Sequence, residues 1–361
     1  LFSGWHTGPP DVALARRALT LSDTRIILWN TFRYKYRRMN DMEPIHENFS
    51  YRHAVSGGAD PVPALISHRR ERLAADCSRC CGLCCTALYF SKAEGFPDDK
   101  EAGIPCAHLC EDFSCEVHSS LSGRRLKGCI NYDCFGAGQT ATEIVFQGKS
   151  WRQLPDPEEM FRVFFLELKL HEAMWYLEEA AILRPASALR PRIHAALTGL
   201  EKLADGSRQD LTEDGIHDRI TAANDLLKET IRLTLDYAAS QKLPSKKGGI
   251  SRSARSHSAS SHNTPGTNGA GPLRFLGYHF QGADLSAMDF SSSFLIAADL
   301  RGCRLFGTCF LGTDLRDADL KGADLRDAFF LTQMQINAAK GSRDTRLPSW
   351  LKMPDHWESG R

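Results

Sequence analysis

The stretch Gly282-Ala283-Asp284-Leu285-Ser286 belongs to a run in which a large apolar residue recurs at every fifth position. Neither the helical period of about 3.6 residues nor the strand period of about 2 fits this spacing. A four-sided coil of about 20 residues fits, because one large and one small side chain then point inward on each side. The large residues are Phe275, Phe280, Leu285, Phe290, Leu295, Leu300, Leu305, Phe310, Leu315, Leu320, Leu325 and Phe330. The small residues two positions earlier are Ala283, Ser293, Ala298, Cys303, Thr308, Thr313, Ala318, Ala323 and Ala328.

This pattern resembles the pentapeptide-repeat family, for example in Lys321-Gly322-Ala323-Asp324-Leu325-Arg326. The resemblance implies a right-handed quadrilateral β-helix, a solenoid, over residues 273–341. About three coils would stand about 14 Å tall. We expect a capping helix over 332–339 and a tail, 342–361, that folds back. Cys303 and Cys309 fit the repeat, so we expect Cys303 to be structural.

The net charge of the repeat segment indicates which kind of partner such a coil would bind. Some pentapeptide-repeat proteins mimic DNA and bind topoisomerases, which requires a long acidic rod. Residues 273–331 carry eight Asp and six Arg or Lys, a net charge of 6 − 8 = −2, on a short coil. We therefore expect a module that binds a protein partner, with a DNA mimic or regulator as the alternative.

The second distinctive segment, 77–134, holds ten of the twelve cysteines. No secretory signal precedes it, so we expect a cytoplasmic protein, in which dense thiols indicate metal binding more than disulfides. The segment carries six basic and eight acidic side chains, 6 − 8 = −2, before any thiol ionises. A bound cation would relieve the repulsion among thiolates. The candidate metal ligands are Cys77, Cys80, Cys81, Cys84, Cys85, Cys106, Cys110, Cys115, His118, Cys129 and Cys134, with His108 as a weaker candidate.

The spacing within this segment resembles a small zinc- or iron-chelating family with the signature C-x2-C-x2-C-C. Cys81-Gly82-Leu83-Cys84-Cys85 matches its second half, whereas Ser78 stands where the family has its first cysteine. If 77–85 is helical, Cys77, Cys81, Cys84 and Cys85 share one stripe, and Gly82 would permit a bend. The resemblance implies metal binding and no particular reaction.

The number of candidate ligands does not decide which metal binds or how many ions are bound. Two zinc sites would use about eight ligands, an iron–sulfur cluster about four, and bridging thiolates could build a multinuclear site. Structural zinc is preferred, and iron or copper is the alternative. A metalloenzyme of the oxidase type would use His171 or His118 as ligand or base. Glu167, His171, Trp175 and Glu178 share one helix face, for which an ordinary helix surface is the favoured interpretation.

The remaining chain predicts a multidomain protein with an irregular Cys-rich metal-binding domain, an α-helical unit and the solenoid. Residues 1–70 are poorly patterned, although Arg25–Arg38 interleaves basic and aromatic residues. Residues 71–150 form the Cys-rich domain, with a short strand over 142–146. Residues 151–243 predict helices over 156–183, 187–204 and 212–239. Residues 244–272, rich in Ser and Gly, predict a flexible linker. The net charge of +1 predicts no general attraction to nucleic acid.

Overall fold

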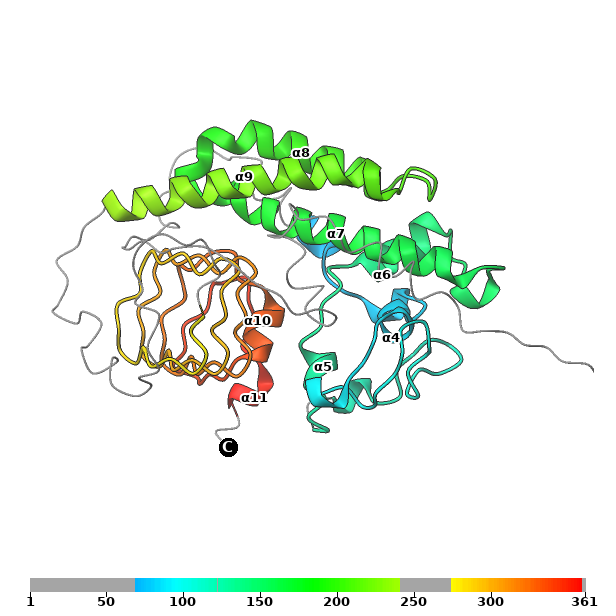
Figure 1. The fold of residues 1–361 in the computed structure, drawn as a ribbon, viewed down its shortest axis with the longest axis horizontal. Coiled ribbons are helices and arrows are strands. Elements are labelled where there is room, and N and C mark those ends of the chain that lie inside the picture. Colours follow the sequence, from blue (N-terminus) through cyan, green and yellow to red (C-terminus); the bar gives the residue numbers. More distant parts are fainter. Residues whose placement is uncertain (1–68, 122, 241–273, 359–361) are drawn as a thin grey trace, which may run out of the picture.

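The computed structural model describes residues 69–121, 123–240 and 274–358. The predictions for residues 1–68 and for the linker 244–272 therefore lie outside the described residues. The solenoid and the cysteine-rich segment lie next to each other, and three long helices extend across the top of both (Figure 1). None of the helices in the described ranges combines the length and apolar character needed to cross a membrane.

Three helices form the α-helical unit, close to the predicted ranges. They are α7 (Pro157–Ile182), α8 (Arg190–Ala204) and α9 (Glu213–Ser240). Helix α7 begins where Asp156 accepts a hydrogen bond from the Glu158 amide (3.0 Å), with Pro157 in the first turn. The predicted second helix starts later than expected, because a 3-10 turn, η6 (Arg184–Leu189), precedes α8. Helix α7 is buried on nearly all sides, between the other two helices and the cysteine-rich segment.

The cysteine-rich segment consists of short turns, and the strand predicted over 142–146 is wrong. Its elements are η1 (Cys77–Arg79), α4 (Leu83–Ala87), η2 (Lys92–Glu94), η3 (His118–Ser120), α5 (Lys127–Ile130), α6 (Ala137–Gln139), η4 (Thr140–Val145) and η5 (Trp151–Gln153). A continuous helix over 77–85 does not form, because Cys80 is extended (φ −121°) and Gly82 is left-handed (φ +70°). The strand over 142–146 is a helical turn instead. Ala141 and Val145, four residues apart, bury on one side against the helical core.

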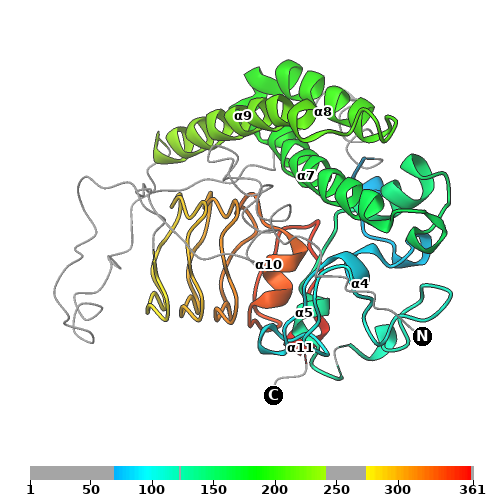
Figure 2. The ribbon, with the colours of Figure 1, turned by 45° about the vertical axis from the view of Figure 1, so that its right-hand side comes forward.

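The solenoid repeats every 20 residues. Parallel bridges join residues 20 apart, such as Arg274 to Phe294 and Phe294 to Asp314, so that successive coils stack (Figure 2). The large residues at every fifth position fill the interior from Phe280 to Leu325, and the small residues two positions earlier lie beside them. Phe330, the next residue of the period, packs in the core around α7 instead. This stacking agrees with the four-sided coil expected from the sequence, while the right-handed quadrilateral classification stays a prediction.

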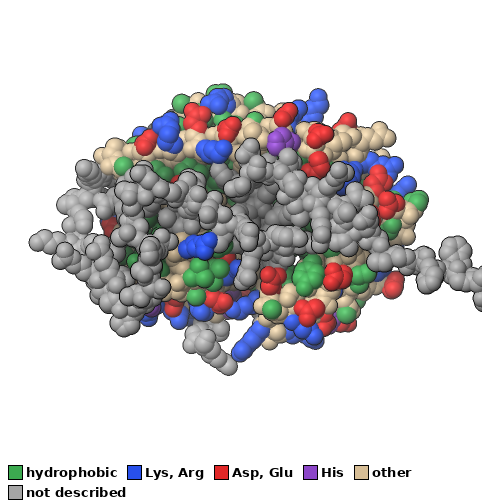
Figure 3. Space-filling model, in the orientation of Figure 1, with side chains coloured by type: hydrophobic (Ala, Val, Ile, Leu, Met, Phe, Trp, Pro, Cys, Tyr) green, Lys and Arg blue, Asp and Glu red, His purple; other side chains and the backbone are tan. Residues whose placement is uncertain are grey.

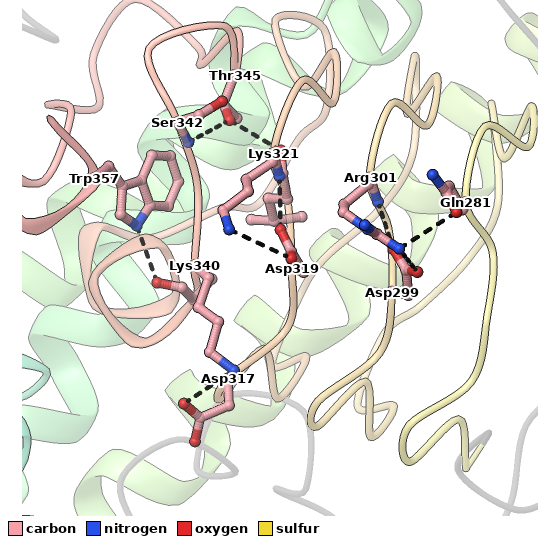
Figure 4. Close-up of polar contacts among 12 residues, drawn as sticks. Gln281, Asp299, Arg301, Asp317, Asp319, Lys321, Lys340, Ser342, Thr345 and Trp357 are labelled. Carbon is pink, nitrogen blue, oxygen red and sulfur yellow. Dashed lines mark hydrogen bonds and ion pairs between the residues drawn. The ribbon is translucent and has the colours of Figure 1, made fainter. Parts of the chain in front are cut away.

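Aspartates hold the corners of the coil. The Asp299 carboxylate accepts hydrogen bonds from the Arg301 amide (3.2 Å) and guanidinium, and Asp319 accepts one from the Lys321 amide (3.1 Å) (Figure 4). Such a side-chain turn fixes the chain direction two residues on. The corresponding aspartates in other coils are Asp284, Asp289, Asp314 and Asp324.

The C-terminal end of the solenoid is capped, and the tail belongs to it. Helix α10 (Gln333–Ala338) begins with Thr332 and Gln335 capping each other. The tail then returns to the coil, since Arg346 bridges to Asp324 and the Trp357 indole donates to the Ala339 carbonyl (3.0 Å, Figure 4). A short last helix, α11 (Asp355–Glu358), follows.

One side of the solenoid packs against the helical unit and shares its core. Apolar side chains at outward positions of the coil join the core of α7, and they are Ala287, Cys309, Leu311 and Phe329. The Phe330 ring meets the Tyr176 ring edge-on at 5.8 Å, and the Phe330 amide donates to Glu179 Oε1 (3.0 Å). Lys127, the first residue of α5, pairs with Asp317 (2.9 Å). The solenoid is thus a docked part of this fold, which the prediction of a separate module on a linker did not include.

Candidate metal centre

Cys84 and Cys85 stand at the start of α4, where the chain turns sharply. Gly82 takes a left-handed conformation, and Leu83 buries in the core, so the two cysteines that follow stay near the surface. Their Sγ atoms are 3.9 Å apart. Two thiolates bound tetrahedrally to one zinc ion at about 2.3 Å each would lie about 3.8 Å apart, whereas a disulfide bond is about 2.05 Å long. The spacing therefore suits a shared ion.

A first group of thiols surrounds Cys85. Burial raises the pKa of Cys106, Cys115 and Cys129, in the last case to about 12, and the charge of Cys85 raises each further. The pKa of Cys77 is also raised, first by burial and then by the charge of Cys85. These four sulfurs are thus close enough to Cys85 to repel it when ionised. A metal cation among them would reverse the sign of that interaction.

A second group surrounds Cys84 and contains Cys80 and Cys134. Burial raises the pKa of Cys80 to about 12 and of Cys134 to about 11. A Cβ atom built on Gly138 would lie 2.7 Å from the sulfur of Cys80 and 3.9 Å from that of Cys134, so a glycine makes room for this pair. The buried hydroxyl of Tyr132 interacts electrostatically with these sulfurs and has no hydrogen-bond partner among the residues described.

Lys100 supplies a positive charge beside both groups. Its ammonium donates to the carbonyls of Thr86 (3.0 Å) and Leu88, and burial lowers its pKa to about 8. A hydrogen bond from Cys84 and the charge of Lys100 together lower the pKa of Cys85, against the effect of burial. Cys85 is therefore the thiol most readily converted to the thiolate that binds a metal.

The other predicted ligands make different contacts, although His108 donates a backbone hydrogen bond to Cys106. Cys81 is buried in the core, with its sulfur 3.4 Å from Thr142 Oγ1 and 3.9 Å from Met160 Sδ. The side chain of His118 is exposed, and His108 pairs with Glu116 at 2.5 Å. Cys110 interacts electrostatically with Cys115 only at the rim of the first group.

The thiols fit a soft metal ion by donor type and by the spacing of Cys84 and Cys85, but they do not converge on one point. Over residues 69–121, 123–240 and 274–358, no three His, Cys, Asp or Glu side chains are arranged to hold an ion as they stand. Binding would require the sulfurs of each group to close by side-chain rotation, and their pairwise repulsion would oppose that closure in the absence of a cation.

Helix α7 adds a buried acid–base pair that the sequence interpretation placed on an ordinary helix surface, which is wrong. His171 and Glu167 are 0% exposed, and His171 Nε2 lies 3.4 Å from Glu167 Oε2. His171 Nδ1 donates to the Phe135 carbonyl at 2.6 Å, since a carbonyl only accepts. Phe135 is left-handed (φ 50°) and follows Cys134 directly. The pair therefore braces the turn that carries Cys134.

Comparison with known proteins assigns the solenoid to a class of repeat protein. The family description "Pentapeptide repeats" matches residues 279–307 and 298–330 with eight copies, so the C-terminal part is a pentapeptide-repeat domain. The match lies within the solenoid, and the resemblance of the cysteine-rich segment stays a prediction.

A full-length relative then defines the family of the whole chain. The chain is 43% identical over 289 residues to "Uncharacterized protein YybG" of Bacillus subtilis (strain 168), covering 79% of this chain and 95% of the relative. It therefore belongs to the same protein family as YybG. The shared length exceeds the solenoid several times over, so the similarity includes much of the chain before it.

Proposed function

We propose that this protein binds a soft metal ion through the cysteine-rich segment 77–134 and presents a pentapeptide-repeat solenoid for protein interaction. The observation that carries the metal proposal is the 3.9 Å separation of Cys84 and Cys85 sulfurs at the junction of two thiol groups. Zinc is the preferred ion, because all-sulfur sites of four ligands suit it. Iron and copper are the alternatives, since thiolates also suit them.

The two thiol groups support adjoining sites that meet at Cys84 and Cys85. The first group would supply Cys77, Cys106, Cys115 and Cys129 to Cys85, and the second would supply Cys80 and Cys134 to Cys84. A bound metal would supply cross-links to a segment made of short turns. Because the unfolded chain lacks such a site, metal binding would add directly to the folding free energy.

The alternative of an oxidase-like metalloenzyme receives less support. It needs His171 or His118 as ligand or base, but both ring nitrogens of His171 already face Phe135 and Glu167. The exposed His118 side chain lies outside both thiol groups.

The solenoid supports protein interaction better than DNA mimicry. Acidic side chains at its corners pair with basic ones two residues on, as in Asp299–Arg301 (2.6 Å) and Asp324–Arg326 (2.6 Å). Figure 3 shows Lys or Arg side chains and Asp or Glu side chains interspersed on the described surface that is visible from this side. A partner would bind the sides of the coil that the helical unit leaves uncovered.

Metal analysis of protein purified without oxygen tests the proposal. We expect at least one zinc, iron or copper ion per chain, lost when Cys84→Ser and Cys85→Ser are combined. Cys81→Ala and His118→Ala are matched controls, because the structure places Cys81 in the core and His118 at the surface. Folded wild-type protein without metal, or controls that lose metal as completely as the double variant, would contradict it.

A further inference from the structure

Arg70 lies where three parts of the chain meet. It belongs to the helical turn 69–72, which precedes the cysteine-rich segment. Its guanidinium carbon lies 5.1 Å from the ring centre of Trp175 on α7 and 5.3 Å from that of Trp350 in the C-terminal tail. Both distances lie in the range of cation–π contacts. The guanidinium of Arg70 therefore lies within cation–π distance of two indoles.

The Nε/Nη2 edge of this guanidinium has no acceptor in the described structure. Arg70 Nε and Nη2 are buried and make no hydrogen bond with any described residue, and the same holds for Trp175 Nε1. A guanidinium has five N–H donors and no acceptor, so only an acceptor from elsewhere can satisfy them. Buried donors without acceptors are rare, because each costs about 1–3 kcal/mol, and more when charged.

The neighbouring Arg69, in contrast, has hydrogen-bond acceptors for its guanidinium. Arg69 Nε and Nη2 donate to the two oxygens of Glu201 at 2.5 and 3.1 Å, and Nη1 donates to Glu178 Oε1 at 3.2 Å. Glu178 attracts Arg70 electrostatically, but no hydrogen bond joins the two side chains. Arg69 thus bonds both oxygens of Glu201 and one oxygen of Glu178, while Glu178 Oε2 and the Nε and Nη2 donors of Arg70 make no hydrogen bond in the described structure.

The unpaired edge is the one that this protein repeatedly uses for carboxylates. Nε and Nη2 of one arginine contact one carboxylate in Arg69–Glu201, Arg301–Asp299 and Arg326–Asp324. This parallel pair of N–H groups matches the two oxygens of a planar carboxylate. A phosphate can also accept from this edge, so the preference for a carboxylate rests on these internal examples.

We propose that the Nε/Nη2 edge of Arg70 binds the carboxylate of a small-molecule ligand, with Trp175 Nε1 as an additional donor. The Trp175 ring also contacts the Phe135 ring, with ring centres 5.6 Å apart, and Phe135 follows Cys134. The ligand would therefore be anchored next to the cysteine-rich segment. This site does not depend on the proposed metal, because none of its donors is a thiol.

The test follows the arginine Nε–H and tryptophan Nε1–H signals of the full-length protein by NMR. Acetate and benzoate are titrated against chloride at constant ionic strength. The signal missing from Arg70→Lys identifies Arg70, and Arg192→Lys, which alters an exposed arginine paired with Glu229, is the control. Circular dichroism and thermal unfolding establish that both variants fold.

We expect saturable shifts of the Arg70 and Trp175 signals with either carboxylate, and affinity at least about tenfold weaker in Arg70→Lys, since lysine keeps the charge but lacks the paired donors. Arg192→Lys should bind as wild type does. The proposal is overturned if no shift saturates, as for donors bonded only to water or to an internal carboxylate. It is also overturned if Arg70→Lys binds equally well, or if inorganic phosphate binds as tightly as acetate.

Discussion

Replacing Gly138 by alanine adds one methyl group, and we expect this change to affect the metal-bound protein and the metal-free protein differently. Gly138 lies within α6, and its conformation accepts an alanine. The added Cβ would lie 2.7 Å from Cys80 Sγ, well inside the contact distance of about 3.5–4 Å. In Gly138→Ala the sulfur of Cys80 must therefore move.

The size of the effect depends on whether that sulfur is free to move. In metal-free protein it can rotate away, and alanine is favoured over glycine inside a helix by about 1 kcal/mol, so stability should change little or rise. In metal-bound protein the sulfur is fixed. Altering the surroundings of a metal ligand typically weakens binding by about 10- to 100-fold, which corresponds to about 1.4–2.7 kcal/mol.

The assay is urea unfolding under reducing, oxygen-free conditions, with metal and with a chelator. The metal-dependent part of the unfolding free energy should fall in Gly138→Ala. Gly199→Ala on α8 is the matched control, because its Cβ would meet only the flexible end of Arg219 at 2.8 Å. The reasoning is refuted if Gly138→Ala binds metal as tightly as wild type, or if it loses the same stability with and without metal.

Three further predictions concern the fold. Phe330→Ala should lower the unfolding free energy by about 3–5 kcal/mol in urea titrations, because the ring is fully buried against Tyr176; a loss below about 1 kcal/mol would argue against docking of the solenoid. Burial raises the pKa of Glu178 to about 7, against the opposing charge of a nearby arginine. The folded protein therefore holds this proton more tightly than the unfolded chain, and the contribution of Glu178 to stability is complete below about pH 4.5 and lost as the pH rises through 7. The stability of wild type relative to Glu178→Gln should thus fall by about 1–2 kcal/mol between pH 4.5 and 7.5, and a rise would contradict this. Gly136→Ala should abolish folded expression or cost about 3 kcal/mol or more, since φ is +79° and Cβ would lie 2.4 Å from the Arg72 carbonyl oxygen; wild-type thermal stability would refute it.

The interior of the solenoid could be predicted from sequence because a five-residue period has few structural solutions. Each large residue from Phe280 to Leu325 is buried at the position that the period assigns, whereas Phe330 packs in the core around α7. The docking of the solenoid was not predicted, although a signal existed. Cys309, Leu311 and Phe329 are apolar at outward positions, where most coils carry charged residues. Outward apolar residues in a regular solenoid indicate a covered face.

The cysteine-rich segment was harder to predict because its conformation depends on tertiary contacts. A short apolar run such as 142–146 fits a strand or a helical turn equally well by pattern, and packing against α7 decides between them. The burial of Glu167 and His171 was also missed, because carboxylates on a helix usually face water. Helix α7 is covered on nearly all sides, so most of its polar residues lie inside as well.

The sequence could only partly distinguish cysteines near the proposed metal from cysteines in the core. Spacing identified Cys84 and Cys85, and the structure places them together. Spacing alone gave Cys81 equal weight, whereas Leu83 and Cys81 both turn toward the core once Gly82 reverses the chain. The direction of a side chain after such a turn depends on what packs behind it, which the local sequence does not contain.

X-ray absorption at the metal edge of protein purified without oxygen tests the central claim most directly, since it measures the bonds between sulfur and metal. We predict a sulfur shell at about 2.3 Å with close to four ligands per ion, weakened in the Cys84→Ser, Cys85→Ser double variant. A metal surrounded only by nitrogen and oxygen, or folded protein whose sulfur spectrum shows disulfides and no metal, would contradict the account.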